Sequence, residues 1–280
     1  MTERLRLGIF GWPVAHSKSP KMHESAARAL GIRLRYERFE VAPVDLKDAV
    51  RRQHELGIDG YNLTVPHKEA IVDLIDEVAP GAQTIGAVNT VVRTAGRYVG
   101  HNTDAPGLVR SLEETGVQLR NARVVVLGAG GAARAVVVGL SHAGAQAIAV
   151  LSRRPEQSKA LTDSLAGRLQ CALESAPIGE ASTYFPNATL LVQATSATLE
   201  SNPSAAEFAA SLPMEALPAD ATVVDLVYKP LRTSVLARAE ECGLSVVDGL
   251  GMLLYQGAIA FEMWTGLRPP IDVMRSALND

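Results

Sequence analysis

The feature that most restricts the fold of this chain is a glycine-rich turn between an apolar strand and a helix. The predicted strand covers residues 124–127, the turn reads Gly128-Ala129-Gly130-Gly131, and the predicted helix covers residues 132–143, starting at Ala132. Glycine lets the backbone turn tightly and approach a pyrophosphate, which then lies at the N-terminus of the helix. An ordinary strand-to-helix turn is the alternative. In this context the turn predicts a dinucleotide-binding unit.

Short apolar strands alternate with amphipathic helices along the rest of the chain, which is typical of an α/β protein. Strands are expected over residues 5–10, 36–41, 148–151, 189–193 and 222–227, and helices over residues 20–30, 44–56, 68–78 and 104–115. Residues 87–93 and 98–100 flank a turn and predict a hairpin. A complete α/β block ends near Asp104, before the glycine turn, which indicates two lobes with a cleft between them.

The composition is that of a soluble globular protein, with 47% hydrophobic and 20% charged residues in a chain of 280. A net charge of -3 and a pI near 6.1 argue against binding to nucleic acid or to a membrane surface. Two cysteines without a CxxC pair, and histidines without ligand spacing, argue against a disulfide framework and a metal site. We expect no signal peptide and no membrane span, and therefore a cytoplasmic protein.

The end of the next strand distinguishes between the two nicotinamide cofactors. Proteins that bind NAD commonly have Asp or Glu about 20 residues after the turn, to bind the ribose 2′-hydroxyl. This chain has Ser152-Arg153-Arg154 instead, and guanidinium groups suit a 2′-phosphate. Two solvated arginines at a helix start are the alternative, and Glu156 lies past Pro155 inside that helix. The sequence therefore favours NADP.

Ser17-Lys18-Ser19-Pro20 is a candidate anion site in the first lobe. Ser19 before Pro20 fits a helix N-cap followed by a proline at the first helical position, which explains Ser19 but not Ser17. Two hydroxyls at the positive end of a helix also suit a substrate carboxylate. From the residues alone, capping and carboxylate binding remain equally open.

Two polar segments in the first half of the chain carry groups suited to proton transfer. The first, residues 62–68, ends in Lys68, and the second, residues 101–104, ends in Asp104. A lysine and a carboxylate beside amides and hydroxyls can hold a small polar substrate and move its protons. Lys68 begins a predicted helix, where its charge opposes the helix dipole, so a purely structural role is less attractive. Together with the nucleotide turn, these segments indicate a dehydrogenase.

Several of these segments resemble the shikimate dehydrogenase family. The matching motifs, in family order, are residues 11–20, 62–68, 86–90, 102–104, 128–134 and 248–253, followed by Gln256. Each motif alone is weak evidence, but the ordered set is specific and extends over nearly the whole chain. The resemblance implies NADPH-dependent reduction of 3-dehydroshikimate to shikimate, on the route to aromatic amino acids.

The resemblance also implies a role for individual residues. Lys68 and Asp104 would be the catalytic acid/base pair, and Ser17 and Ser19 would bind the substrate carboxylate. The other expected substrate ligands are Asn62, Thr64, Asn89, Tyr228 and Gln256. The expected cofactor site consists of Gly128, Ala129, Gly130, Gly131, Ala132, Ser152, Arg153, Arg154, Thr195 and Gly249. Without the resemblance, Asn62, Asn89 and Gln256 would be interpreted as turn or cap residues, and Tyr228 as a packing residue.

The expected fold has an N-terminal α/β substrate domain at residues 1–104 and a Rossmann-like NADP-binding domain at residues 105–248. The resemblance implies that the C-terminal helices, residues 249–280, return to the first lobe. The expected partners are the small-molecule substrate and NADP, with no nucleic acid and no membrane, in a monomer or homodimer.

One residue departs from the family pattern, and other functions remain possible. The family usually has Asn-Ala-Thr-Ser near the nicotinamide, whereas this chain has Gln193-Ala194-Thr195-Ser196, which leaves open how that loop is held. A quinate or quinate/shikimate dehydrogenase that uses NAD or either cofactor is the main alternative. A non-catalytic sensor would not need the lysine and the aspartate, and nothing in the sequence indicates the folate pocket of a methylene-tetrahydrofolate dehydrogenase.

Overall fold

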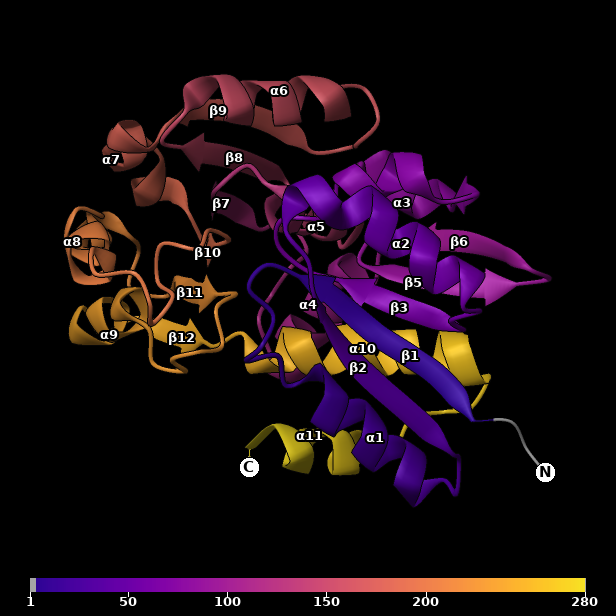
Figure 1. Cartoon of the computed structure of the whole chain (residues 1–280). Helices are drawn as coiled ribbons and strands as arrows, with labels where there is room; N and C mark the ends of the chain where they lie inside the picture. The colour runs from indigo at the N-terminus through magenta and orange to yellow at the C-terminus, as the bar shows by residue number, and fades with distance from the viewer. Residues whose placement is uncertain (1–3, 280) are drawn as a thin grey trace. The chain divides into compact units, whose positions relative to one another are not determined.

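The computed structural model describes residues 4–279 and divides into two compact α/β units (Figure 1). The first unit contains the residues up to Thr103 and those from Leu254 onwards, and the second contains Asp104–Leu253. The α/β fold is as predicted. The predicted domain boundaries differ slightly from these units, because Asp104 and residues 249–253 belong to the second unit.

The sheet of the first unit has six strands in the order β2-β1-β3-β5-β6-β4. The strands are β1 (Leu5–Gly11), β2 (Leu34–Glu40), β3 (Gly60–Leu63), β4 (Glu77–Val78), β5 (Thr90–Thr94) and β6 (Arg97–His101). β1 is parallel to β2 and β3, whereas β5 is antiparallel to β3 and β6. The C-terminal ends of β1, β3 and β6 and the start of β5 therefore lie at the same end of the sheet, which we call its polar edge. The polar motifs of this unit are found there.

Helices cover this sheet, and two of them come from the C-terminal end of the chain. They are α1 (Ser19–Ala29), α2 (Leu46–Glu55), α3 (Pro80–Ile85), α10 (Leu250–Thr265) and α11 (Ile271–Asn279). α11 packs against α1, where yellow and indigo helices lie side by side in Figure 1. In α10, Trp264 Nε1 donates a hydrogen bond to the carbonyl of Val91 at 2.9 Å. The expectation that the C-terminal helices return to the first lobe is confirmed.

The predicted helix over residues 68–78 is wrong. A short 3-10 helix occupies Ala70–Leu74, and the chain then enters β4. The backbone N–H groups of Asp76 and Ala79 donate to the carbonyls of Tyr98 and Gly100 at 3.1 and 2.9 Å. Pairing with β6 thus takes the donors that a longer helix would have used. The predicted hairpin is confirmed as β5 and β6, although β5 begins at Thr90.

The sheet of the second unit has six parallel strands in the order β12-β11-β10-β7-β8-β9. The strands are β7 (Arg123–Leu127), β8 (Ala147–Ser152), β9 (Ala172–Pro177), β10 (Leu190–Gln193), β11 (Thr222–Asp225) and β12 (Ser245–Val247). The helices are α4 (Asp104–Glu114), α5 (Gly131–His142), α6 (Pro155–Leu165), α7 (Ala181–Tyr184), α8 (Ala205–Ala210) and α9 (Ser234–Glu241). This is the strand order of a dinucleotide-binding fold. Strands β8 and β9 follow on one side of β7, and β10, β11 and β12 follow on its other side, so the order reverses between β7 and β10.

Two strands of this sheet were not predicted. β9 reads Ala-Leu-Glu-Ser-Ala-Pro and lacks an apolar run, and β12 has three residues. Both lie at the edges of the sheet, where fewer side chains are buried on two faces. Within residues 4–279, none of the helices has the length and apolarity needed to cross a lipid bilayer.

Candidate active site

The glycine turn lies at the point where the strand order of the second sheet reverses. Ligands of open α/β sheets bind at this point, outside the carboxyl ends of the strands. Gly128 follows β7 and has a φ of +116°, a conformation that other residues rarely adopt. A Cβ on Gly128 would lie 2.8 Å from Thr195 Cγ2 and 3.2 Å from the carbonyl oxygen of Ala194, in the loop after β10. Glycine is therefore required both by the backbone and by the neighbouring loop.

The start of α5 has the form of a pyrophosphate site. Gly130 is the N-cap residue of α5 and has no side chain to accept hydrogen bonds from the first-turn amides. A Cβ built on Gly130 would meet nothing within 4 Å, so the space beside it is open. Gly131 and Ala132 are half-buried at this end, whereas Ala133 is fully buried where the helix packs. These residues fit a bound dinucleotide.

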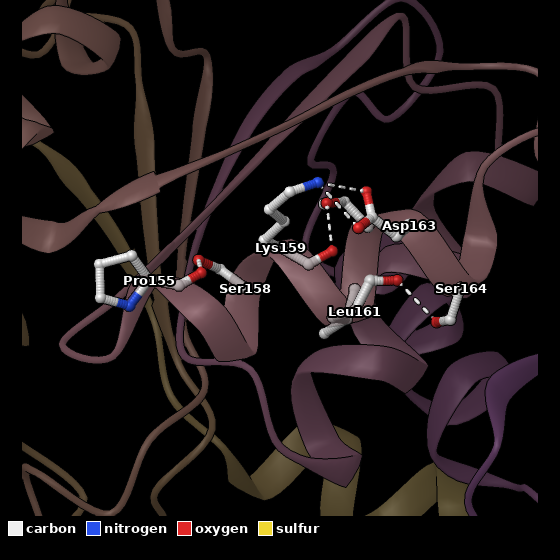
Figure 2. A network of polar contacts seen from close by, with 7 residues as sticks. Pro155, Ser158, Lys159, Leu161, Asp163 and Ser164 are labelled. Carbon is white, nitrogen blue, oxygen red and sulfur yellow. Dashed lines mark hydrogen bonds and ion pairs between the residues drawn. The ribbon is translucent and has the colours of Figure 1, made fainter.

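The arginines expected to bind a 2′-phosphate lie at the carboxyl end of β8. Arg153 and Arg154 are exposed, and Arg154 is the N-cap residue of α6. Ser152 Oγ donates to the carbonyl oxygen of Arg154 at 2.7 Å, which shapes the turn. Lys159, one turn into α6, forms an ion pair with Asp163, with 2.8 Å between Nζ and Oδ2. Figure 2 draws this pair. The lysine is thus directed along the helix, and the two arginines supply positive charge at its start.

Local side-chain bonds lie at both ends of α6, whose residues are drawn in Figure 2. Ser158 Oγ donates to the carbonyl of Pro155 at 3.0 Å, and Ser164 Oγ donates to the carbonyl of Leu161 at 2.7 Å. Ser158 is fully buried, so its hydroxyl needs such a partner. Both bonds run from a serine to the carbonyl three residues earlier in the same helix.

Gln193 holds the loop that follows β10. Its Oε1 accepts from the backbone N–H of Thr195 at 2.5 Å, and its Nε2 donates to the carbonyl of Thr195 at 3.1 Å. Nε2 also donates to Thr198 Oγ1 at 2.9 Å and to Asp225 Oδ1 at 3.3 Å. The longer amide therefore reaches both ends of the loop and the neighbouring strand. This answers how the loop is held despite the departure from the family pattern.

Asp225 is a buried carboxylate at the end of β11. Burial raises its pKa, while hydrogen bonds from the Val227 backbone and from side chains including Thr233 and Gln193 oppose that change. Val227 N donates to Oδ1 at 2.9 Å, and Thr233 Oγ1 donates to Oδ2 at 2.7 Å. The Asp225 carboxylate thus connects the loop after β10 with the segment that leads to Tyr228, which is half-buried.

Gly249 packs at the same edge of the second sheet. A Cβ on Gly249 would lie 2.4 Å from the carbonyl oxygen of Leu226. Close packing against the end of β11 explains the glycine, and its contact with a cofactor stays a prediction.

Buried amides and hydroxyls form a connected cluster at the polar edge of the first sheet. Asn62 Nδ2 donates to the Asn89 carbonyl and to Thr90 Oγ1, both at 3.0 Å. Asn89 Nδ2 donates to Thr103 Oγ1 at 3.0 Å and to Gln256 Oε1 at 3.3 Å. Asn89 Oδ1 accepts from the backbone N–H of Thr103 at 2.7 Å. The structure therefore brings together the three amides that the family resemblance selected.

Ser17 and Ser19 lie at the start of α1, and of the two interpretations left open for Ser19, the structure does not show the helix N-cap. α1 begins at Ser19, its N-cap residue is Lys18, and Pro20 occupies the first turn. Pro20 has no N–H, and the N–H of Ser19 donates to Ser17 Oγ at 3.3 Å. The capping hypothesis did not explain Ser17. In the structure, its hydroxyl accepts the backbone N–H of the first residue of α1. Both serines are buried.

The expected catalytic residues lie at defined backbone positions. Lys68 is half-buried in the turn before the 3-10 helix, and its carbonyl accepts from the N–H of Val88 at 2.8 Å. Asp104 is the first residue of α4, next to Thr103, and is 4% exposed. The positive end of a helix dipole stabilises a negative charge at such a position. Thr64 is half-buried at the end of β3, where its N–H donates to the carbonyl of Phe10 at 2.9 Å.

Sequence reasoning missed four residues, of which three contact this cluster and one contacts Ser17. Thr90 and Thr103 are buried within it, and each has a hydroxyl bonded to Asn89 Oδ1, at 3.1 and 3.2 Å. Tyr36 and Arg38 on β2 bond to Asn62 and to Ser17. The alternation of residues in β2, which places Tyr36 and Arg38 on one face, was the signal available in the sequence.

Three family models match the chain. A shikimate dehydrogenase substrate-binding domain matches residues 9–91, a shikimate/quinate 5-dehydrogenase matches residues 110–218, and a shikimate 5′-dehydrogenase C-terminal domain matches residues 249–278. An NADP(+) shikimate dehydrogenase from Symbiobacterium thermophilum is 44% identical over 277 residues, which is 97% of this chain and 92% of that protein.

Solved structures of a shikimate and a quinate dehydrogenase are similar to nearly the whole chain. A shikimate 5-dehydrogenase from Thermus thermophilus, in complex with NADP(H) and shikimate, is 41% identical with a TM-score of 0.85 and covers 98% of both chains. A quinate dehydrogenase from Corynebacterium glutamicum, in complex with NAD, is 32% identical with a TM-score of 0.87 and covers 98% of both chains.

Proposed function

The chain belongs to the shikimate dehydrogenase family, and we propose that it catalyses the reversible, NADPH-dependent reduction of 3-dehydroshikimate to shikimate. It is an oxidoreductase of aromatic amino-acid biosynthesis that binds shikimate and NADP. The proposal extends to a cytoplasmic location and to a monomer or homodimer. The observation that carries the site assignment is the buried cluster of Asn62, Asn89 and Gln256, whose amides suit the hydroxyls of a small polyol acid.

The second unit supplies the residues that would hold NADP. The pyrophosphate would lie at the start of α5, beside Gly130 and Gly131, where the space is open. Arg153 and Arg154 would hold the 2′-phosphate, and Thr195 would lie near the nicotinamide. When bound, NADPH supplies the hydride that reduces the ketone carbon of the substrate.

The first unit supplies most of the groups that would bind the substrate, and Asp104, the first residue of the second unit, would complete the catalytic pair. Ser17 and Ser19 would bind the carboxylate, and Tyr228, a residue of the second unit, is the other carboxylate ligand that the resemblance implies. As the ketone is reduced, negative charge develops on its oxygen, and the ammonium group of Lys68 stabilises that charge and can donate a proton. Asp104 orients the same hydroxyl and takes part in the proton transfer.

Replacement of either catalytic residue tests this assignment. Lys68→Ala and Asp104→Asn should each lower kcat by roughly 10²- to 10⁴-fold, the contribution of a positioned acid or base. The affinity for NADPH should change little, because the residues that would hold the pyrophosphate and 2′-phosphate are separate from this pair. Turnover within about threefold of the unmodified protein for either variant would contradict the assignment.

The alternative activity is that of a quinate/shikimate dehydrogenase, which the similarity to an NAD-bound quinate dehydrogenase favours as the second candidate. Quinate carries an extra hydroxyl beside the carboxylate, and serine hydroxyls are adaptable partners that would discriminate by only about 10²-fold. The test follows the reduction of NADP and of NAD with shikimate and with quinate. Equal kcat/KM for both acids, or better activity with NAD, would move the chain to this alternative.

A further inference from the structure

Strand β2 lies at the edge of the first sheet, and no role was assigned to its residues from the sequence. Side chains two residues apart project from the same face of a strand. Tyr36 and Arg38 therefore share a face. Both make hydrogen bonds to residues of the proposed substrate site.

Tyr36 determines which way the amide of Asn62 points. Its phenol Oη lies 2.6 Å from Asn62 Oδ1, while Asn62 Nδ2 donates to the Asn89 carbonyl and to Thr90 Oγ1. The oxygen of the amide therefore faces β2, and its nitrogen faces β5. A rotated amide would place its NH₂ group against the phenol and its oxygen against Thr90 Oγ1 and the Asn89 carbonyl, so both bonds from Nδ2 would be lost.

The phenol acts as the donor in this pair. Burial raises the pKa of Tyr36 well above its ordinary value, although a hydrogen bond with Ser19 and the charge of Arg38 lower it in part. Tyr36 thus stays protonated, with one hydrogen to give. That hydrogen is donated to Asn62 Oδ1, so the phenol is a fixed donor beside the proposed substrate site.

The Tyr36 ring is held in place by its neighbours. The ring of His23 stacks on it at 4.8 Å with an angle of 14°, and the ring of Trp264 lies 6.2 Å away. The backbone N–H of Tyr36 donates to the carboxylate of Glu24 at 3.2 Å. With ring and backbone both held, the phenol oxygen has a defined position from which to orient Asn62.

Arg38 fixes the backbone of the serine turn. Its Nε and Nη2 both donate to the carbonyl oxygen of Ser17, at 3.2 and 2.6 Å. A charged donor makes a stronger hydrogen bond than a neutral one, and two donors from a planar group also fix direction. Ser17 Oγ in turn accepts from the N–H of Ser19. The position of both serines thus depends on the Arg38 side chain.

We propose that Tyr36 and Arg38 are positioning residues for substrate recognition. Tyr36 orients the amide of Asn62, and Arg38 holds the turn that carries Ser17. The inference rests on the proposed function, in which Asn62 and Ser17 bind the substrate.

Tyr36→Phe tests the first half, because it removes the hydroxyl and keeps the stacked ring. We expect kcat/KM for shikimate to fall about 3- to 10-fold, the worth of one hydrogen bond, with the KM for NADP unchanged. Tyr98→Phe is the matched control. Its phenol is buried in the same sheet and bonds to the carbonyls of Ile58 and His54, so its loss should not alter shikimate kinetics. An equal fall of kcat/KM in both variants would show that Tyr36 has only a structural role.

Arg38→Met tests whether Arg38 holds the turn that carries Ser17. This test does not depend on how well the tyrosine variant folds. The KM for shikimate should rise about 3- to 10-fold or more, with a smaller change in kcat. Arg35→Met removes the same charge from the opposite face of β2, where Arg35 pairs with Glu37 at the surface. An equal rise in the KM for shikimate for Arg38→Met and Arg35→Met would indicate general electrostatics and overturn the positioning role.

A double-mutant cycle separates this inference from the proposed function. Asn62→Ala should itself impair shikimate kinetics, and adding Tyr36→Phe should cause little further loss, because the phenol acts through the amide. Additive losses, or a Tyr36→Phe enzyme within about twofold of the unmodified one, would overturn the positioning role alone. If Asn62→Ala and Ser17→Ala both leave shikimate kinetics unchanged, the substrate site itself is wrongly assigned and both proposals fall.

Discussion

Gln193→Met removes the amide that holds the loop after β10 and keeps a side chain of similar length. The amide bonds to the backbone of Thr195 on both its N–H and its carbonyl, to Thr198 Oγ1 and to Asp225 Oδ1. Thr198 and Asp225 are buried, at 1% and 0% exposure, so water cannot easily replace the lost bonds. Thr195 is half-buried and can turn to water.

The expected loss follows from these partners. Leaving a buried polar group without a partner costs about 1–3 kcal/mol, and two partners are buried here. Since Asp225 retains its bonds from Val227 and Thr233, we expect the free energy of unfolding to fall by about 2–4 kcal/mol. Ordering a backbone residue costs about 1–2 kcal/mol, so a loosened loop that must order around the cofactor should raise the Kd for NADPH about 5- to 30-fold.

Urea unfolding and calorimetric titration with NADPH measure the two effects separately. Thr233→Val is the control, because it removes a bond to Asp225 at 2.7 Å and a helix cap to Leu236 N at 3.2 Å but leaves Gln193 in place. It should cost about 1–3 kcal/mol of stability with little change in NADPH affinity. A Gln193→Met protein that is destabilised as expected, yet binds NADPH with an unchanged Kd, would refute the link between this loop and the cofactor.

Two further predictions concern a buried histidine and the 2′-phosphate. Burial lowers the pKa of His23 to about 3, so the unfolded state binds more protons between pH 3 and its ordinary value of 6.5, and stability falls as the pH decreases through that range, by about 2 kcal/mol at pH 5. His23→Phe keeps a ring against Tyr36 and should flatten the pH dependence of the unfolding free energy; curves for the two proteins that stay parallel from pH 7.5 to 5 would contradict this. Arg153→Ala should weaken NADPH binding by about 1.5–3 kcal/mol and leave NADH binding unchanged in the same titration, whereas an equal loss for both cofactors would show a structural role.

Local patterns in the sequence were sufficient for the elements around the glycine turn of the second unit. The apolar run of β7 and the glycine turn after it predict a buried strand, a tight turn and a helix, because each depends on neighbouring residues alone. The hairpin of β5 and β6 was predictable for the same reason, since Ala95 and Gly96 adopt positive φ at its turn. The prediction that Lys68 and Asp104 form the catalytic pair came from their residue types and from the resemblance to a family, and hydrophobic periodicity contributed nothing to it.

The tertiary structure decided where local preference and long-range pairing compete. Residues 68–78 have helical periodicity, yet β4 forms because Asp76 and Ala79 bond to β6, which lies about 20 residues further along the chain. At the start of α1, the N–H of Ser19 donates to the hydroxyl of Ser17. The positions of these groups in the folded chain decide this pairing, and the sequence alone does not show it.

The polar contacts of the site were also decided by the tertiary structure. In the sequence, Tyr36 and Arg38 alternate with charged residues and have the pattern of a solvated edge strand. In the fold, their side chains reach Asn62 and the carbonyl of Ser17, which come from other strands and turns. The sequence by itself determined which polar groups the chain contains and which short elements carry them. Their partners depend on distance and direction between segments far apart in the chain, and only the packed structure sets those.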